Sequence, residues 1–239
     1  MKAVILAGGK GTRLRPYTLV WPKPLMPLGK YFIIDVVFHQ LKYYGFTEIY
    51  MAVGHLNHLL RKYLGEEKDG LKIHYSLEEE PLGTAGPLGL IPNLFESPFL
   101  VMNGDVLTTL HYKNLMDFHI QSQALASIAT FQRPISLGFG AVKKTSDGRV
   151  TEYKEKPVFH YAVSMGVYAF SPEVGSYIPK GQYLDFPDLI QRLIQDGKKV
   201  SAYQEDCLWL DIGRQEDYNQ AVQKFNHDIH LYMPALSSH

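Results

Sequence analysis

The chain has 239 residues, enough for one large α/β domain whose core needs no disulfide or structural metal. Its 24 lysines and arginines balance 24 aspartates and glutamates, so no overall charge favours nucleic acid or an anionic membrane, and any anion site must be local. The single cysteine, Cys207, excludes an intrachain disulfide, and no apolar run is long enough for a signal peptide or a membrane span. We expect a soluble cytoplasmic protein with neither a nucleic-acid nor a membrane partner.

The first predicted element is a buried strand over residues 2–6, an apolar run that ends at a glycine-rich loop. Three glycines in this loop leave backbone N–H groups open to a ligand. Lys10 and Arg13 lie in or beside it, and Lys23 follows between two prolines, so three positive charges can converge. The spacing matches neither the Walker loop nor the dinucleotide-binding loop. A site for a phosphate-rich ligand is predicted, with a flexible surface turn as the alternative.

The next predicted elements alternate between helix and strand. Apolar residues recur at helical spacing or in short β-type runs. This predicts helices over 33–44 and 55–64, with strands over 48–53 and 71–76. Such alternation predicts a parallel sheet with helices on both faces. Ligands bind beyond the carboxyl ends of such strands, where the glycine loop lies.

Two polar motifs follow at positions where strands end. Residues 78–80 form an acidic run that is typical of a solvated loop. Gly83 and Gly86 follow, and they let the backbone lie against a flat ligand. A helix is predicted over 86–94. A strand over 99–102 stops at Asn103-Gly104-Asp105, so Asp105 should point into the same cleft as the glycine loop. One or two carboxylates suffice for Mg²⁺ when phosphates share the ion, although a plain hairpin turn also fits this tripeptide.

In the second half of the chain, the predicted helices and strands alternate less regularly, and the chain ends in a tail. Predicted helices cover 112–123, 184–196 and 215–225, and predicted strands cover 126–133, 136–143, 150–155, 162–170 and 200–204. We expect the strands between 136 and 155 to add to the sheet in antiparallel fashion, with the charges of 152–156 on a solvent face. Asp211, in Trp209-Leu210-Asp211-Ile212-Gly213, could merely cap the helix that follows. We expect one domain over 1–226 and a frayed tail over 227–239, whose His227, His230 and His239 suggest a metal site only weakly.

Several motifs together resemble one family. Residues 6–27 read L-A-G-G-x-G-T-R-L-x-P-x-T-x-x-x-P-K-P-L-x-P, and N-G-D, E-K-P and W-x-D-I-G follow at 103–105, 155–157 and 209–213. This set resembles the signature of the sugar-1-phosphate nucleotidyltransferases, also called nucleotide-sugar pyrophosphorylases. The segment E-P-L-G-T-A-G at 80–86 is more similar to the family's mannose-1-phosphate guanylyltransferase branch than to its short thymidylyltransferase branch. Ser164 departs from the asparagine of many relatives, which leaves the sugar preference open.

The resemblance implies a Rossmann-like, mixed and mostly parallel sheet flanked by helices. Some longer relatives carry a C-terminal β-helix, which we do not expect in a chain of this length. It implies Mg²⁺-dependent transfer of a nucleotidyl group from an NTP to a sugar 1-phosphate, with GTP and mannose 1-phosphate as the leading pair. The sugar phosphate is already anionic at pH 7, so no general base is needed. The implied catalytic residues are Arg13, Lys23, Asp105, Lys156 and Asp211, of which Asp105 and Asp211 hold the metal. The implied nucleotide-binding residues are Leu6, Ala7, Gly8, Gly9, Gly11, Thr12, Arg13, Gly83, Thr84 and Gly86, and the implied sugar-binding residues are Gly140, Glu155, Lys156 and Gly166.

Two alternatives to this reaction stay open. One is the same chemistry with another pair, namely thymidylyl, uridylyl or cytidylyl transfer to glucose 1-phosphate or another sugar phosphate. The other is an inactive nucleotide-sugar-binding regulatory subunit, although the joint presence of the five implied catalytic residues argues against it. A homo-oligomer is compatible with the sequence.

Overall fold

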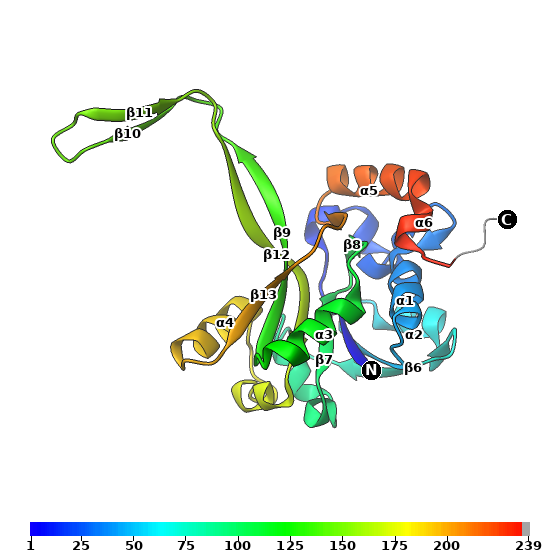
Figure 1. Cartoon of the computed structure of the whole chain (residues 1–239). Coiled ribbons are helices and arrows are strands. Elements are labelled where there is room, and N and C mark those ends of the chain that lie inside the picture. Colours follow the sequence, from blue (N-terminus) through cyan, green and yellow to red (C-terminus); the bar gives the residue numbers. More distant parts are fainter. Residues whose placement is uncertain (236–239) are drawn as a thin grey trace.

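The protein is built around an eight-stranded mixed sheet, seen in a computed structural model that describes residues 1–235 (Figure 1). The strand order is β13-β9-β12-β7-β1-β4-β6-β5. Its parallel half has β1 (Lys2–Ala7) at the centre, between β4 (Glu48–Val53) and β7 (Phe99–Asn103), with β6 (Leu71–Leu77) beside β4 and the short β5 (Glu67–Lys68) at the edge. The predicted parallel sheet and Rossmann-like class are confirmed.

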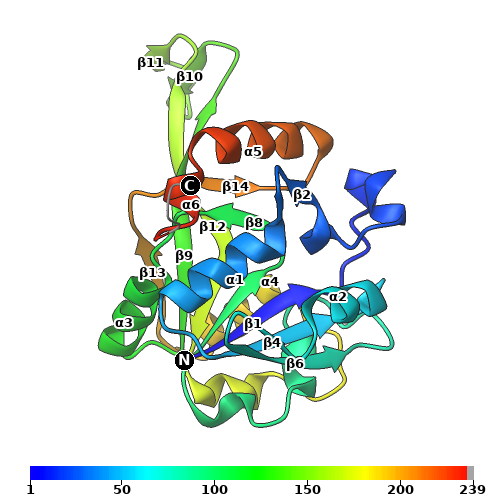
Figure 2. The same cartoon turned by 90° about the vertical axis from the view of Figure 1, so that its right-hand side faces the viewer.

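The three central parallel strands, β1, β4 and β7, are buried on both faces, which explains their nearly continuous apolar runs, whereas β6 toward the edge alternates between buried and exposed residues. Ile5 of β1 faces one apolar cluster together with α1 (Ile33–Tyr43), α2 (Asn57–Leu64) and α3 (Tyr112–Ser122). Val4 faces a second cluster with α4 (Phe186–Gln195) and the 3-10 helices η4 (Gly86–Leu90) and η6 (Pro172–Tyr177). Figure 2 shows α1 lying across the sheet, with α5 beyond it. The helix predicted over 86–94 is thus a shorter 3-10 helix.

The antiparallel half of the sheet continues into an arm that leaves the body. β12 (Val158–Phe170) pairs antiparallel with β7 and β9 (Ala126–Ser136), and β13 (Val200–Gln204) pairs parallel with β9. Beyond the body, β9 and β12 pair only with each other and lead to the hairpin β10 (Ala141–Lys144) and β11 (Val150–Lys154), a separate two-stranded sheet. Both views show this arm, residues 133–161, projecting outward (Figures 1 and 2).

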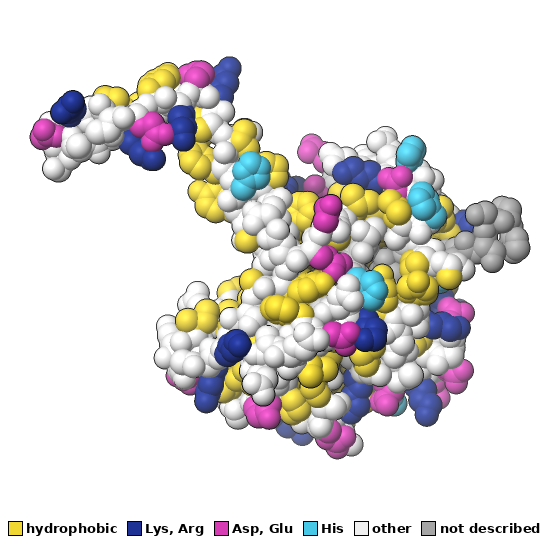
Figure 3. Space-filling view, viewed as in Figure 1, with side chains coloured by type: hydrophobic (Ala, Val, Ile, Leu, Met, Phe, Trp, Pro, Cys, Tyr) yellow, Lys and Arg dark blue, Asp and Glu magenta, His cyan; other side chains and the backbone are white. Residues whose placement is uncertain are grey.

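The arm corrects one prediction. Strands between 136 and 155 do not add to the central sheet, because the hairpin satisfies its own backbone pairing. Large apolar side chains are exposed along the arm, and Figure 3 shows them where it leaves the body. They are Ile135, Leu137, Phe139, Val142, Val150, Tyr153, Val158, Phe159 and Tyr161.

The C-terminal segment is packed as far as it is described, so the expected frayed tail from residue 227 is wrong up to Ala235. Helix α5 runs over Gln215–His227 and is followed by α6 (Ile229–Tyr232). Tyr232 is fully buried in a third apolar cluster, and its carbonyl accepts a 2.7 Å hydrogen bond from Gln40 Nε2 of α1. His239 lies outside the described residues. Among residues 1–235, no helix has the length and apolar character needed to cross a membrane.

Candidate active site

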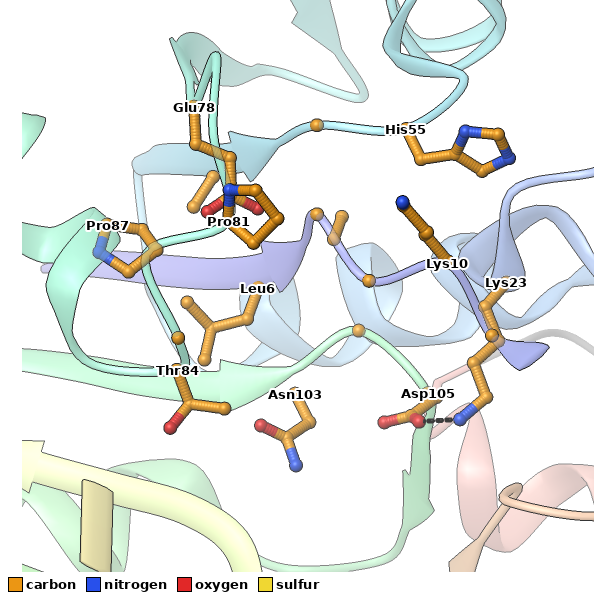
Figure 4. A pocket seen from close by; sticks show the side chains of 18 of the residues that line it. Leu6, Lys10, Lys23, His55, Glu78, Pro81, Thr84, Pro87, Asn103 and Asp105 are labelled. Atoms are coloured by element: carbon orange, nitrogen blue, oxygen red, sulfur yellow. Dashed lines mark hydrogen bonds and ion pairs between the residues drawn. The ribbon is translucent and has the colours of Figure 1, made fainter. Parts of the chain in front are cut away.

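A cleft of about 1000 Å³ opens at the carboxyl ends of β1, β4 and β7 (Figure 4). Parallel strands end at the same edge, so loops far apart in the sequence meet there. Most of the predicted nucleotide-binding and catalytic residues line this cleft: Leu6, Ala7, Gly8, Gly9, Gly11, Thr12, Arg13, Lys23, Gly83, Thr84 and Asp105.

The glycine loop has an ordered backbone and room for a ligand. Gly11 adopts a left-handed φ of 57°, and its carbonyl accepts hydrogen bonds from Leu14 N at 2.9 Å and Thr18 Oγ1 at 2.7 Å. A Cβ at Gly9 would meet no atom within 4 Å, whereas a Cβ at Gly8 would lie 1.8 Å from Glu78 Oε1. Gly9 therefore leaves open space, while Gly8 makes room for a protein carboxylate.

The charged end of the cleft gathers cations and carboxylates. Lys23 forms an ion pair with Asp105, and Lys10 lies on the same side (Figure 4). Asp105 directly precedes β8 (Val106–Thr108), which pairs with β14 (Trp209–Asp211), and Ile212 N donates a 3.3 Å hydrogen bond to the Asp105 carbonyl. This pairing brings Asp211 beside Asp105, although 105 residues separate them in sequence.

The proximity of these two carboxylates affects the ionisation of Asp211. Partial burial raises the pKa of Asp211, and the negative charge of Asp105 raises it further, while Lys23 and Arg13 act in the opposite direction. Residues 1–235 hold no cluster of three histidine, cysteine, aspartate or glutamate side chains that could bind a metal unaided. A cation between Asp105 and Asp211 would need further oxygens from a ligand, which is how Mg²⁺ binds with one or two carboxylates and substrate phosphates.

The opposite end of the cleft is tied to the segment before α4. Leu184 O accepts hydrogen bonds from Ala85 N at 2.8 Å and Gly86 N at 2.9 Å. A Cβ at Gly83, where φ is 78°, would lie 2.6 Å from Leu184 O, and one at Gly86 would lie 2.5 Å from Gln182 O. These glycines permit close packing against the protein itself, and Gly86 does not line the cleft.

Four predicted sugar-site residues lie outside the cleft lining. Gly140, Glu155 and Lys156 are on the arm, where Glu155 Oε2 accepts a 2.9 Å hydrogen bond from Tyr153 Oη. Gly166 lies at a bulge in β12 with a φ of 72°, and a Cβ there would come within 2.6 Å of Asn103 Nδ2. Gly166 is therefore close to the cleft, whereas the other three are not brought to it.

The cleft also contains residues that the sequence reasoning missed. Glu78 is half-buried, and burial raises its pKa while a 3.2 Å hydrogen bond from Leu82 N lowers it. His55 and Asn57 follow the carboxyl end of β4, so the rule that located Asp105 could have found them. Tyr183 also lines the cleft, but it reaches this place through tertiary packing and gives no local signal.

The fold and the site together define a class: an α/β protein with a nucleotide-sized cleft whose charged end suits phosphates. The chain belongs to the nucleotidyl transferase family, whose profile matches residues 2–228. It is 35% identical, over 93% of its length, to a UTP–glucose-1-phosphate uridylyltransferase of Synechocystis sp.. It is 34% identical, over 91% of its length, to a mannose-1-phosphate guanyltransferase of Neurospora crassa. The predicted family is confirmed.

The likeness extends to solved structures but not to the full length of the curated relatives. The match covers 63% of the Synechocystis protein and 62% of the Neurospora protein. A Bacillus anthracis protein assigned as a glucose-1-phosphate thymidylyltransferase, solved with sucrose, superposes with a TM-score of 0.73 at 25% identity, covering 93% of this chain and 94% of that one.

Proposed function

We propose that this chain transfers a nucleotidyl group from an NTP to a sugar 1-phosphate and releases pyrophosphate. The observation that carries the proposal is the meeting, at one sheet edge, of the glycine loop, Lys23 and Asp105, with Asp211 of β14 beside Asp105 although it does not line the cleft itself. Family membership supports the same reaction. A binding subunit without activity would also need cations for the phosphates of its ligand, but it would not need two neighbouring carboxylates to hold a metal.

The chain's own residues supply positioning and charge in the proposed mechanism. Backbone N–H groups of residues 8–11 bind the triphosphate, and Arg13 neutralises its terminal phosphates. Lys23 turns from Asp105 toward the phosphates when they enter, since both lie at the same end of the cleft. The sugar phosphate needs no general base because its oxygen is already anionic. The barrier falls because two polyanions are held in line by fixed cations.

Mg²⁺ fits the proposal because Asp105 and Asp211 are adjacent carboxylates that leave coordination positions for phosphate oxygens. These two residues would hold the ion. When bound, it supplies Lewis-acid stabilisation of the reacting phosphate.

We assign contact with the acceptor sugar phosphate to Glu155 and Lys156, as the family resemblance implies. Both residues lie on the arm, outside the cleft. This role therefore requires the arm to approach the cleft when the acceptor binds.

GTP and mannose 1-phosphate are the leading substrates in this proposal. Glu79 and Glu80 line the cleft and are exposed. Guanine presents two adjacent donors, N1–H and N2–H, that suit a carboxylate, which only accepts hydrogen bonds when ionised. The Neurospora guanyltransferase supports the same pair. The Synechocystis uridylyltransferase favours a second candidate, UTP with glucose 1-phosphate.

The test measures pyrophosphate release with Mg²⁺ across GTP, dTTP, UTP, CTP and ATP, each combined with mannose 1-phosphate, glucose 1-phosphate and amino sugar phosphates. Strong release with one pair, lost in Asp105→Asn, is expected. Silence across the panel, with nucleotide binding intact, would refute the proposal in favour of a regulatory subunit. A cytoplasmic location and a homo-oligomeric state are further parts of the proposal that rest on sequence alone.

A further inference from the structure

The arm, residues 133–161, makes its polar side-chain contacts only with itself. Within the described chain, every side-chain hydrogen bond and ion pair of these residues joins two residues of the arm. Figure 3 shows the arm standing clear of the body. A two-stranded ribbon alone is marginally stable in water, and nine large apolar side chains of this one are exposed. The arm therefore has the properties of a segment that another surface covers.

One side of the arm's ladder is apolar. Ile135 of β9 pairs with Phe159 of β12, and directly opposed residues lie on the same side of a ribbon. Phe131 and Tyr161 lie on that side too, because each is an even number of residues away along its strand. Val158, next to Phe159, points to the other side. We call the side with Phe131, Ile135, Phe159 and Tyr161 the apolar face.

The apolar face borders a path to the cleft. Phe131 and Arg133, which share this side of β9, line a cavity of about 640 Å³ together with Asp217 of α5. Arg13 and Gly213 line both this cavity and the cleft, so the two are contiguous. A segment that covered the apolar face, between the arm and α5, would lie at the entrance of this path.

The arm of the same chain does not follow this path. Phe131 lies five residues before Ser136, the end of β9, which is a span of about 17 Å at the rise of a strand. Lys156 lies beyond that end, since Ser136 pairs with Val158. The register from Thr130 to Ser136 has no break, so Lys156 could reach the cleft of its own chain only if this paired ladder bent back.

A second copy of the chain suits the arm in area and in charge. The nine apolar side chains are 40–77% exposed and together present on the order of 1000 Å², whereas a standard interface takes about 800 Å² from each partner. The arm carries six lysines and arginines against three aspartates and glutamates, and the whole chain is balanced at 24 of each, so the body carries the opposite excess. The first turn of α5 holds Glu216 and Asp217, of which Asp217 lines the cavity. The basic arm of one copy therefore complements the acidic body of another.

We infer that two copies of this chain exchange arms, so that their apolar faces pack together and each arm brings Lys156 to the cleft of the other copy. A two-fold interface needs only one self-complementary surface, which the apolar face provides. Each arm then lies between the arm and α5 of the other copy, and the path past Gly213 leads the partner's Lys156 to the acceptor phosphate. The inference rests on the proposed function, which assigns this contact to Lys156. The arm that approaches each cleft is the partner's, and the cleft of a single copy lacks this cation.

The first test asks which copy supplies Lys156. Lys156→Ala keeps an intact cleft, and Asp105→Asn keeps an intact arm. The two variants are produced together with different affinity tags, and the dimer with one chain of each is purified. One of its two sites combines an intact cleft with an intact arm, so kcat/KM for the sugar 1-phosphate of the active pair in the substrate panel should be about half that of the unchanged dimer. If each arm served its own cleft, the mixed dimer would keep about a twentieth, the mean of a site impaired about tenfold and an inactive one.

The second test measures the dimer itself, independently of activity. Ile135→Ser, on the apolar face, should raise the dimer Kd at least about tenfold in sedimentation velocity, because the apolar side chain is lost from both copies. Val158→Ser is the matched control, since Val158 is 50% exposed against 47% for Ile135 but lies on the other side of the ladder. This control should change the Kd by less than about threefold.

Three outcomes would overturn the inference. They are a chain that stays monomeric at about 100 μM, equal effects of the two serine variants on the Kd, and a mixed dimer with about a twentieth of the activity. Failure of the proposed reaction is distinguishable from failure of the arm exchange. An unchanged dimer that is silent across the substrate panel, yet dissociates in Ile135→Ser, would refute the reaction and leave the interface. Turnover by a dimer that Ile135→Ser does not weaken would refute the exchange alone.

Discussion

Thr84→Val should destabilise the protein by about 2 kcal/mol. The Thr84 hydroxyl accepts a 2.8 Å hydrogen bond from Phe186 N, the first residue of α4, and donates at 3.0 Å to Asp185 Oδ1. Valine keeps the shape but removes both bonds. The orphaned N–H costs about 1 kcal/mol and the lost bond to the exposed carboxylate about 1 more. For a domain of this size the melting temperature should fall by about 4–8 °C.

The same change should weaken nucleotide binding, because Thr84 lines the cleft and this contact fixes its wall against α4. Thermal unfolding followed by circular dichroism, with KM for the nucleotide measured in parallel, gives both quantities. Thr84→Ser should restore most of the stability. Thr151→Val removes an exposed 3.2 Å bond on the arm and should shift the melting temperature by about 1 °C or less. A melting temperature for Thr84→Val equal to that of the Thr151 control would refute this reasoning.

Three further predictions concern the charged residues. If Asp105 holds the ion, Asp105→Asn should lower turnover roughly 100-fold or more, since Lewis-acid stabilisation is worth several kcal/mol. The control is Asp117→Asn, which changes an exposed aspartate on α3. Full turnover of the Asp105→Asn variant at saturating Mg²⁺ would contradict the assignment. The raised pKa of Asp211 means that the folded state binds protons more readily than the unfolded one, so ionisation costs stability as pH rises above about 3.8. Asp211→Asn should therefore melt higher than the unchanged protein at pH 7, with a difference that vanishes well below pH 3.8; equal melting temperatures at pH 7 would count against it. Lys156→Ala should raise KM for the sugar phosphate about tenfold and leave KM for the NTP nearly unchanged, and a normal sugar-phosphate KM would remove the assignment.

Local chemistry in the sequence sufficed for the parallel half of the fold. The prediction for β4 matches the observed Glu48–Val53, and the glycine loop lies at the sheet edge, as the alternation of elements requires. The sequence also predicted the position of Asp105 in the cleft, because a residue that follows a parallel strand lies at the edge of the sheet where ligands bind. Periodicity and chain order carry this information, since both faces of a parallel sheet must be buried.

Tertiary structure alone decided which distant residues meet. The pairing of β8 with β14 brings Asp211 to Asp105. Gly83 and Gly86 pack closely against the segment before α4, and this contact, which requires glycine at both positions, is visible only in the folded structure. The arm is the clearest example. Its alternating residues predict strands correctly, but a hairpin satisfies its backbone hydrogen bonds whether it joins a sheet or stands alone. Local pattern therefore specifies the strand, while its neighbours depend on packing between segments far apart in the chain.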